Sequence, residues 1–189
     1  MFREDIEKSL EILNRGGVIL YPTDTVWGIG CDATNPTAVE RIFTIKFRRE
    51  TQAMLTLVDG FDMLARYVED IPDIAVQLMK ETAKPLTIIY PKAKNMASNL
   101  IAGDGSAGIR IVREPFCRQL IGEFGKPVVS TSANISGEGT PATFGDISEK
   151  IRAAVDFIVS WRQDERRAAT ASSIIQINVD GSYRVVRYS

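Results

Sequence analysis

The sequence has no histidine, and its only cysteines are Cys31 and Cys117. Histidine is the commonest general base near neutral pH and the commonest zinc ligand. Its absence excludes Ser-His-Asp hydrolases, histidine zinc sites and histidine-containing di-iron bundles. Two isolated cysteines are too few for a disulfide framework or a thiolate zinc site, and they are typical of a reducing compartment. We therefore expect a cytoplasmic protein without a protein-bound metal.

Long apolar runs are also missing. No stretch approaches the roughly 18 consecutive apolar residues of a membrane span, and charged residues interrupt the first 13 positions, unlike a secretory signal. We expect no membrane association. The formal net charge is −1, from 23 basic and 24 acidic side chains. This balance is not typical of a protein that coats nucleic acid, although it is compatible with a local basic patch.

Helical and strand-like apolar spacings alternate along the chain. The patterns predict helices at about 2–13, 35–47, 61–68, 74–82, 115–124 and 146–153. They predict strands at 18–21, 54–58, 86–90, 108–112, 127–130, 157–159, 173–179 and 182–187, the last two joined by a hairpin turn at Asp180-Gly181. Residues 22–32 are expected to form a loop. We find no repeat or linker, so we predict a single α/β domain over residues 1–189, with a twisted, open mixed sheet of undetermined strand order.

The glycine-rich segment 103–108 matches G-x-G-x-x-G, but it precedes a predicted strand, whereas a dinucleotide fingerprint follows a strand and opens a helix. We interpret it as a turn that could border a pocket near Arg110. Arg110 itself lies inside an apolar strand pattern. Because an unpaired cation in a buried strand is costly, it should face a carboxylate of the protein or of a ligand.

Three polar segments are candidate ligand sites. Residues 22–30, Pro-Thr-Asp-Thr-Val-Trp-Gly-Ile-Gly, follow a buried strand, where open α/β sheets bind ligands, although an ordinary turn would look similar. Residues 46–49, Lys-Phe-Arg-Arg, could clamp an anion at an exposed helix end or merely complement the helix dipole. Residues 130–137, Ser-Thr-Ser-Ala-Asn-Ile-Ser-Gly, would let a ligand approach the backbone or could simply form a capping turn.

Taken together and in this order, these segments resemble the YrdC-type family of L-threonylcarbamoyl-AMP synthases over nearly the whole chain. The resemblance rests on the loop 22–30, the K-x-R element Lys46 and Arg48, the strand 108–111 and the segment 132–137. It rests more weakly on 172–175 and Arg187. The resemblance implies a YrdC-like α/β fold with a large concave cavity.

The resemblance also implies a reaction, in which ATP, L-threonine and bicarbonate give threonylcarbamoyl-AMP and pyrophosphate, with magnesium on the phosphates. The product would feed threonylcarbamoyladenosine formation in tRNA through downstream transfer proteins. The family is also associated with double-stranded RNA binding. By matching positions, threonine would be held by Thr25, Arg110, Ser132 and Ser172. ATP would be contacted by Lys46, Arg48, Ser106, Asn134 and Arg187, with Lys46 and Arg48 as the catalytic pair.

The sequence departs from the family pattern at several positions. Trp27 stands where tyrosine is usual, Gln52 replaces the first residue of a Lys-Pro or Asn-Pro pair, Leu57 stands where many members carry histidine, and Ala142 replaces a hydroxyl residue. These changes leave two alternatives open. One is a noncatalytic or differently specific paralogue that binds double-stranded RNA or nucleotide. The other is a maturation role like that of this domain in hydrogenase-maturation carbamoyltransferases.

An RNA-binding alternative would need a basic surface. Candidate residues for such a patch are Arg41, Lys46, Arg48, Arg49, Arg162, Arg166 and Arg167. Because Asp164 and Glu165 lie within the last of these segments, it could equally be an ordinary solvated loop.

Overall fold

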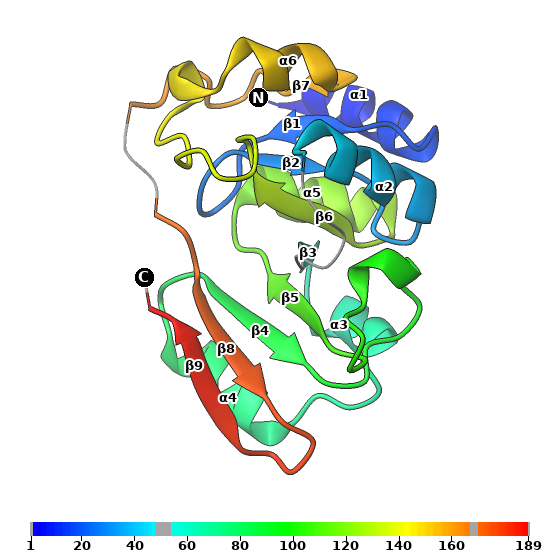
Figure 1. Cartoon of the computed structure of the whole chain (residues 1–189), viewed down its shortest axis with the longest axis vertical. Coiled ribbons are helices and arrows are strands. Elements are labelled where there is room, and N and C mark those ends of the chain that lie inside the picture. Colours follow the sequence, from blue (N-terminus) through cyan, green and yellow to red (C-terminus); the bar gives the residue numbers. More distant parts are fainter. Residues whose placement is uncertain (1, 48–53, 167–169, 189) are drawn as a thin grey trace.

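The protein is described here from a computed structural model, which covers residues 2–47, 54–166 and 170–188. Its centre is a nine-stranded mixed sheet in the order β7-β1-β2-β6-β3-β5-β4-β8-β9 (Figure 1). The strands are β1 (Ile19–Tyr21), β2 (Gly28–Gly30), β3 (Leu55–Val58), β4 (Leu86–Tyr90), β5 (Ala107–Ile111), β6 (Val128–Ser132), β7 (Phe157–Ile158), β8 (Ser173–Ile177) and β9 (Tyr183–Arg187). The predicted α/β class with a mixed sheet is confirmed.

Capping residues mark the bounds of two of the helices. Asn35 accepts hydrogen bonds from two backbone N–H groups of the first turn of α2, and Pro115 begins α5, which Gly125 ends at φ 71°. The helices are α1 (Arg3–Asn14), α2 (Pro36–Ile45), α3 (Phe61–Tyr67), α4 (Asp73–Glu81), α5 (Pro115–Phe124) and α6 (Glu149–Ala154), with short 3₁₀ turns η1 (Ser98–Leu100) and η2 (Phe144–Asp146).

The predicted loop at 22–32 contains a strand, so that part of the prediction is wrong. β2 pairs antiparallel with both β1 and β6. Glycine has low strand propensity, which hides this strand in the sequence. The structure requires small residues there, because a Cβ on Gly30 would lie 2.5 Å from the Val129 carbonyl oxygen and 2.6 Å from the Tyr21 ring.

Two apolar clusters cover the sheet unequally. The larger includes buried residues of α1, α3, α4 and α5, and the smaller includes those of α2 and α6 with β1, β2 and β6. The face of the sheet that packs against the smaller cluster is therefore covered over β1, β2 and β6 but not over β4, β5, β8 and β9. On the uncovered part, side chains alternate: Leu86, Ile88 and Tyr90 enter the core, whereas Thr87 and Ile89 line a cavity. This uncovered half-face positions the candidate site.

Candidate functional site

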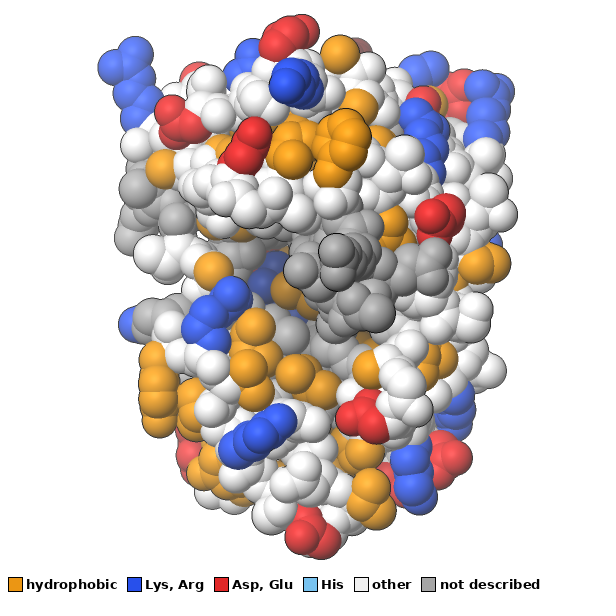
Figure 2. All heavy atoms as spheres, in the orientation of Figure 1, with side chains coloured by type: hydrophobic (Ala, Val, Ile, Leu, Met, Phe, Trp, Pro, Cys, Tyr) orange, Lys and Arg blue, Asp and Glu red, His pale blue; other side chains and the backbone are white. Residues whose placement is uncertain are grey.

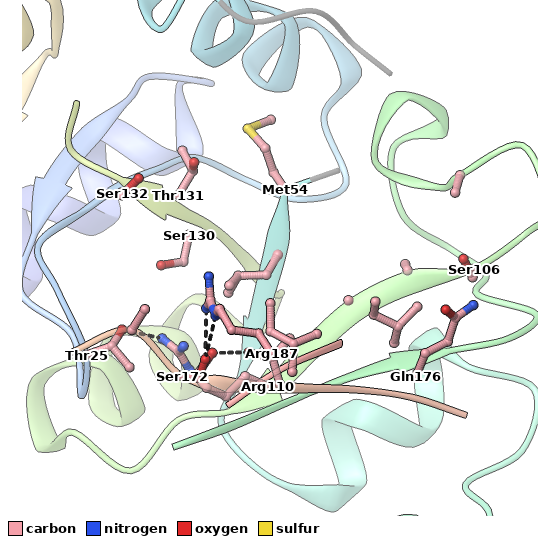
Figure 3. Close-up of a pocket in the computed structure, with 18 of the residues that line it drawn as sticks. Thr25, Met54, Ser106, Arg110, Ser130, Thr131, Ser132, Ser172, Gln176 and Arg187 are labelled. Carbon is pink, nitrogen blue, oxygen red and sulfur yellow. Dashed lines mark hydrogen bonds between the residues drawn. The ribbon is translucent and has the colours of Figure 1, made fainter. Parts of the chain in front are cut away.

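A cavity of about 530 Å³ lies over the uncovered strands. Figure 2 shows the molecule hollowed on this face, and Figure 3 shows the side chains that line the hollow. The walls of the cavity are formed by the loop after β1, the end of β6, the segment before β5 and the segment before β8. Its polar lining comprises Thr25, Thr87, Asp104, Ser106, Arg110, Ser130, Thr131, Ser132, Thr140, Ser172, Gln176, Arg184 and Arg187.

Arg110 is the buried cation of this cavity, with 2% of the residue exposed. One guanidinium nitrogen, Nη2, lies 3.1 Å from Asp24 Oδ1 and donates to Thr25 Oγ1 at 3.2 Å. The prediction that Arg110 faces a carboxylate is confirmed, and the carboxylate belongs to the protein. The Nε atom is buried and has no acceptor among the residues that the structure describes. The guanidinium therefore retains hydrogen-bonding capacity toward an anionic ligand.

The loop after β1 presents Thr25 to the cavity through its own hydrogen bonds. Thr23 Oγ1 donates to the Val26 carbonyl at 2.8 Å and accepts from the Thr25 backbone N–H at 3.0 Å. The two threonine hydroxyls are also 3.0 Å apart. Because the Thr23 proton goes to Val26, the Thr25 hydroxyl donates to Thr23 and accepts from Arg110.

Buried Ser172 and the exposed strand residue Arg187 form a second hydrogen-bonded unit of the cavity (Figure 3). The Ser172 hydroxyl lies 2.8 Å from that of Thr87, and its carbonyl accepts from Arg187 Nε at 3.1 Å and Nη2 at 2.8 Å. The structure thus brings Thr25, Arg110, Ser132, Ser172, Ser106 and Arg187, all predicted as site residues, to one cavity.

Ser106 and Gln176 lie at the other end of the cavity from Thr25 (Figure 3). The Ser106 hydroxyl donates to Asp104 Oδ1 at 2.6 Å, and its backbone N–H donates to the same oxygen at 3.0 Å. These hydrogen bonds lower the pKa of the Asp104 carboxyl, which keeps it ionised at neutral pH. The predicted nucleotide contact Ser106 therefore stands beside a carboxylate.

Lys46 does not have the exposed side chain that the sequence analysis predicted. It is 1% exposed, and its Nζ donates to the carbonyl oxygens of Ser132 and Asn134, the latter at 2.6 Å. Its own carbonyl accepts from the Ser136 backbone N–H at 2.9 Å. α2 ends at Ile45, and the chain turns inward so that the lysine caps this loop. Its partner in the predicted clamp, Arg48, lies outside the described residues.

Asn134 lies in the loop that Lys46 holds. Its amide nitrogen donates to the carbonyls of Ile135 at 3.1 Å and Glu138 at 2.8 Å. Its Oδ1 is buried and has no donor within the described residues. Neither Asn134 nor Lys46 is among the described residues that line the cavity. The structure therefore places these two predicted ATP contacts behind the cavity wall.

The family departures occupy different environments. Trp27 and Ala142 line a small separate hollow, where Trp27 packs on Phe144 with ring centroids 4.8 Å apart. Leu57 is fully buried in the larger apolar cluster rather than exposed to the cavity. Gln52 lies outside the described residues. Trp27, Ala142 and Leu57 are thus not among the cavity-lining residues of the described chain.

The predicted basic patch is only partly supported, because Arg166 is exposed whereas Lys46, Arg41 and Arg162 are buried or paired with carboxylates. Lys46 is buried. Arg41 pairs with Asp156 at 2.5 Å, and Arg162 pairs with Glu165 at 2.5 Å and Glu114 at 3.7 Å. Their charge is therefore largely compensated locally. The candidates Arg48, Arg49 and Arg167 lie outside the described residues.

Thr87, Gln176 and Arg184 line the cavity and were not predicted from the sequence. Ser130, which also lines it, and Asp24, which pairs with Arg110, lie in the candidate segments 130–137 and 22–30. A signal existed for Thr87 and Gln176, since each is polar within an apolar strand pattern, as Arg110 is. No comparable signal marked Arg184, whose strand β9 has exposed residues throughout.

No cluster of three or more His, Cys, Asp or Glu side chains suited to a metal occurs within the described residues. Among those that line the cavity, Asp104 is the single carboxylate. This donor set fits a divalent cation that arrives on substrate phosphates, because Mg²⁺ commonly binds through one or two carboxylates plus phosphate oxygens. Within the described ranges, no helix has the length and apolar character to cross a membrane.

Comparison with known proteins relates this site to a family. The Sua5/YciO/YrdC family, described as "Telomere recombination", matches residues 11–189. A Pseudoalteromonas translucida protein named "Threonylcarbamoyl-AMP synthase" is 34% identical over 157 residues, 82% of this chain and 84% of that protein. A protein of the same name from Vibrio vulnificus is 31% identical, over 86% of this chain and 89% of its own length.

Solved structures share the fold. E. coli YciO superposes with a TM-score of 0.83 at 26% identity, over 97% of this chain and 88% of that one. P. abyssi Sua5 complexed with L-threonine superposes with a TM-score of 0.85 at 24% identity, over 97% of this chain. The present chain spans only 54% of that Sua5 chain. From the family match and the relatives at 30% identity or more, the chain belongs to the Sua5/YciO/YrdC family.

Proposed function

We propose that the protein is an L-threonylcarbamoyladenylate synthase, which joins L-threonine, bicarbonate and ATP into threonylcarbamoyl-AMP with release of pyrophosphate. The observation that carries the proposal is Arg110. It is a buried guanidinium with an unpartnered Nε, set among hydroxyl groups in a cavity of a family whose relatives carry that enzyme name. A carboxylate with a nearby hydroxyl, as in threonine, matches this set of donors and acceptors.

The threonine end would be formed by Thr25, Arg110, Ser132 and Ser172, as the family resemblance implies. Arg110 would bind the α-carboxylate through the N–H groups that Asp24 does not occupy. The hydroxyls of Thr25 and Ser132 would contact the amine and side-chain hydroxyl. Because a buried Arg–carboxylate contact is strong and directional, it would fix the substrate amine in one place.

The nucleotide would occupy the rest of the cavity, with Ser106, Arg187 and Arg48 as contacts. Arg187 uses Nε and Nη2 on the Ser172 carbonyl, which leaves Nη1 for a phosphate oxygen. Lys46 and Asn134 would act from behind the wall, where they fix the loop 132–138 through its carbonyls. We therefore assign Lys46 a positioning role, and Arg48 the direct contact of the K-x-R pair.

The chemistry requires positioning and charge compensation, and no histidine. The threonine amine and bicarbonate form a carbamate with loss of one water, and a carbamate oxygen attacks the α-phosphorus. The bond to the bridging oxygen breaks, and pyrophosphate leaves. Arginine side chains offset the charge that develops on the leaving group. Magnesium on the phosphates would supply additional charge neutralisation.

The product is a mixed anhydride that transfers its threonylcarbamoyl group readily. We propose that downstream proteins use it to form threonylcarbamoyladenosine in tRNA, and that the protein works in the cytoplasm. Direct binding of tRNA or double-stranded RNA would have to use surfaces other than the compensated arginines Arg41 and Arg162.

The test is pyrophosphate release from ATP by the purified protein with magnesium, with threonine and bicarbonate omitted in turn. Release that requires both supports the synthase. Binding of ATP or RNA without release would instead favour the noncatalytic paralogue. Arg110→Lys provides the site control: it retains the charge but loses the fork geometry, and should lower kcat/KM for threonine by about 100-fold.

A further inference from the structure

The turn that follows β7 has a backbone conformation that its residue types do not favour. Arg162 adopts φ 67°, in the left-handed region that glycine occupies most readily. Asp5 of α1 fixes the start of this turn, because its carboxylate accepts from the backbone N–H groups of Ser160 at 3.0 Å and Trp161 at 2.9 Å. A non-glycine residue held in this conformation indicates a role for its side chain.

The Arg162 guanidinium reaches from this turn to the loop after β1. Its Nη1 donates to the Thr23 carbonyl at 3.0 Å and lies 3.7 Å from Glu114 Oε1. Its Nε and Nη2 contact Glu165 Oε2 at 2.6 and 2.5 Å. Glu114 is itself fixed, with 6% of its side chain exposed and its Oε2 accepting from the Cys117 backbone N–H at 2.8 Å. The two carboxylates therefore hold the guanidinium so that one N–H group points at the Thr23 carbonyl.

The loop that receives this hydrogen bond is anchored at three successive residues. Thr23, which is 1% exposed, is held by Arg162 from the turn after β7. Its neighbours are held from the start of α5 instead. The Pro22 carbonyl accepts from Cys117 Sγ at 3.1 Å, and the Asp24 carboxylate accepts from the backbone N–H two residues before α5 at 3.2 Å. Arg162 therefore supplies the one anchor among these three that comes from outside the α5 region.

The anchored carbonyl belongs to the residue that orients Thr25. Thr23 Oγ1 accepts from the Thr25 backbone N–H at 3.0 Å, and the two hydroxyls are 3.0 Å apart. The residue between them, Asp24, pairs with Arg110 at 3.1 Å. A rotation of the Thr23 peptide would therefore move the Thr25 hydroxyl and the counter-charge of Arg110 together. Arg162 is not among the described residues that line the cavity, so its effect on a ligand there must pass through this loop.

We infer that Arg162 is a positioning residue for the threonine end of the cavity, where it holds the loop 22–25 in the conformation that presents Thr25 and Arg110 to the ligand. The inference rests on the proposed function and adds to it a residue that does not contact the substrate. Because Arg162 acts on this loop and not on the nucleotide contacts, its loss should weaken the binding of threonine and leave the binding of ATP unchanged.

Arg162→Gly tests the inference, because it removes the guanidinium and suits the backbone. Glycine adopts this conformation without strain, so an arginine with a purely structural role could be replaced here at little cost. We expect the KM for threonine to rise about tenfold, as for the loss of a hydrogen bond from a charged donor, and the KM for ATP to stay within about twofold of the wild-type value.

Lys92→Gly is the matched control. Lys92 also has a positive φ, 54°, and its exposed side chain pairs with Glu69 at 3.2 Å. The substitution therefore removes a charged side chain from the same kind of backbone conformation without touching the loop 22–25. It should keep both KM values of the wild type.

Arg162→Lys is the second variant. It keeps a positive charge beside Glu114 and Glu165, but its single nitrogen cannot replace the fork that bonds the Thr23 carbonyl and both carboxylates. Its KM for threonine should lie between those of the wild type and Arg162→Gly. Circular dichroism and melting temperatures check that each variant folds. A partly unfolded enzyme loses kcat while its KM values stay, so a fall in kcat alone, or an equal rise in both KM values, overturns the inference.

Hydrogen exchange of the Thr25 amide, measured by NMR, tests the same loop without relying on the reaction. This N–H group is bonded to Thr23 Oγ1, and it should exchange about tenfold faster in Arg162→Gly than in the wild type, while the amides of β6 keep their rates. If neither the wild type nor any variant releases pyrophosphate, the proposed function fails and this exchange decides the role of Arg162. Faster exchange confined to residues 22–26 supports the positioning role, and an unchanged rate overturns it.

Discussion

Asp24 Oδ1 lies 3.1 Å from Arg110 Nη2, although the two side chains come from the loop after β1 and from β5, 86 positions apart in sequence. The Asp24 carboxylate is itself held by the Arg113 backbone N–H at 3.2 Å. Only 2% of the Arg110 side chain and 10% of the Asp24 side chain are exposed. The pair ties the loop to the sheet and aims the guanidinium at the cavity.

Asp24→Asn should destabilise the protein by about 3 kcal/mol, because it leaves the Arg110 cation buried without a counter-charge. Urea unfolding at neutral pH measures this loss. The double variant Asp24→Asn with Arg110→Met should lose less than the sum of the single losses, as expected for a coupled pair. Asp164→Asn, at an exposed position, serves as the control. Additive losses would show that the two residues act independently.

Lys46→Met should lower stability and activity together. The variant keeps the apolar chain length but removes the donor that holds the carbonyls of Ser132 and Asn134, at a cost of about 2 kcal/mol or more. Parallel measurement of the melting temperature and of pyrophosphate release checks this. Lys150→Met, on the exposed side of α6, should change neither. Lost activity at an unchanged melting temperature would instead make Lys46 a direct substrate contact.

Gly30→Ala should destabilise the fold by about 3 kcal/mol, because the new Cβ would collide with the Val129 carbonyl and the Tyr21 ring. Gly139→Ala is the matched substitution, since a Cβ there meets nothing within 4 Å, and it should stay within about 0.5 kcal/mol of the wild type. Denaturant midpoints compare the two. Equal midpoints would contradict the close packing of β2 against β1 and β6.

Asp156→Asn should produce a loss of stability that depends on pH. Arg41 hydrogen bonds, supported by the Val18 N–H, lower the pKa of Asp156 in the folded protein, against partial burial that raises it. A lowered folded pKa gives stability that is fully present above the ordinary aspartate pKa of about 3.9 and is lost as pH falls through the folded value.

The Asp156→Asn variant should therefore be less stable than the wild type by about 1 kcal/mol at pH 7, and the difference should shrink as the pH falls below about 4. Unfolding curves at several pH values measure it. A difference that stays constant across this range would mean that the Asp156 charge does not contribute.

Local signals predicted most elements well. α5 has the predicted bounds, because Pro115 and Gly125 mark its ends, and β4 coincides with an apolar run between two prolines. β2 was missed because its two glycines carry no strand signal, and its existence depends on close contact with Val129 and Tyr21. Strand order could not be predicted, since it depends on contacts between distant segments.

The candidate site likewise combines features that the sequence predicts with features that depend on contacts between distant segments. Arg110 was identified because a cation in an apolar strand needs a partner, and the structure supplies Asp24. The burial of Lys46 could not be predicted, because its acceptors are contributed 86 and 88 positions later in the chain. The pairing of Gln176 with Arg184 could not be predicted either, because it requires the register of β8 with β9. The substrate roles of these residues remain predictions.

Identification of the reaction product tests the proposed synthase activity most directly. The protein is incubated with ATP, magnesium, L-threonine and ¹³C-bicarbonate, and the nucleotides are analysed by mass spectrometry. We expect an adenylate whose mass includes one threonine and one ¹³C carbonyl, and which is absent from the Arg110→Lys reaction within detection. An adenylate without the label, or ATP recovered unchanged under conditions where the protein is folded, would contradict it.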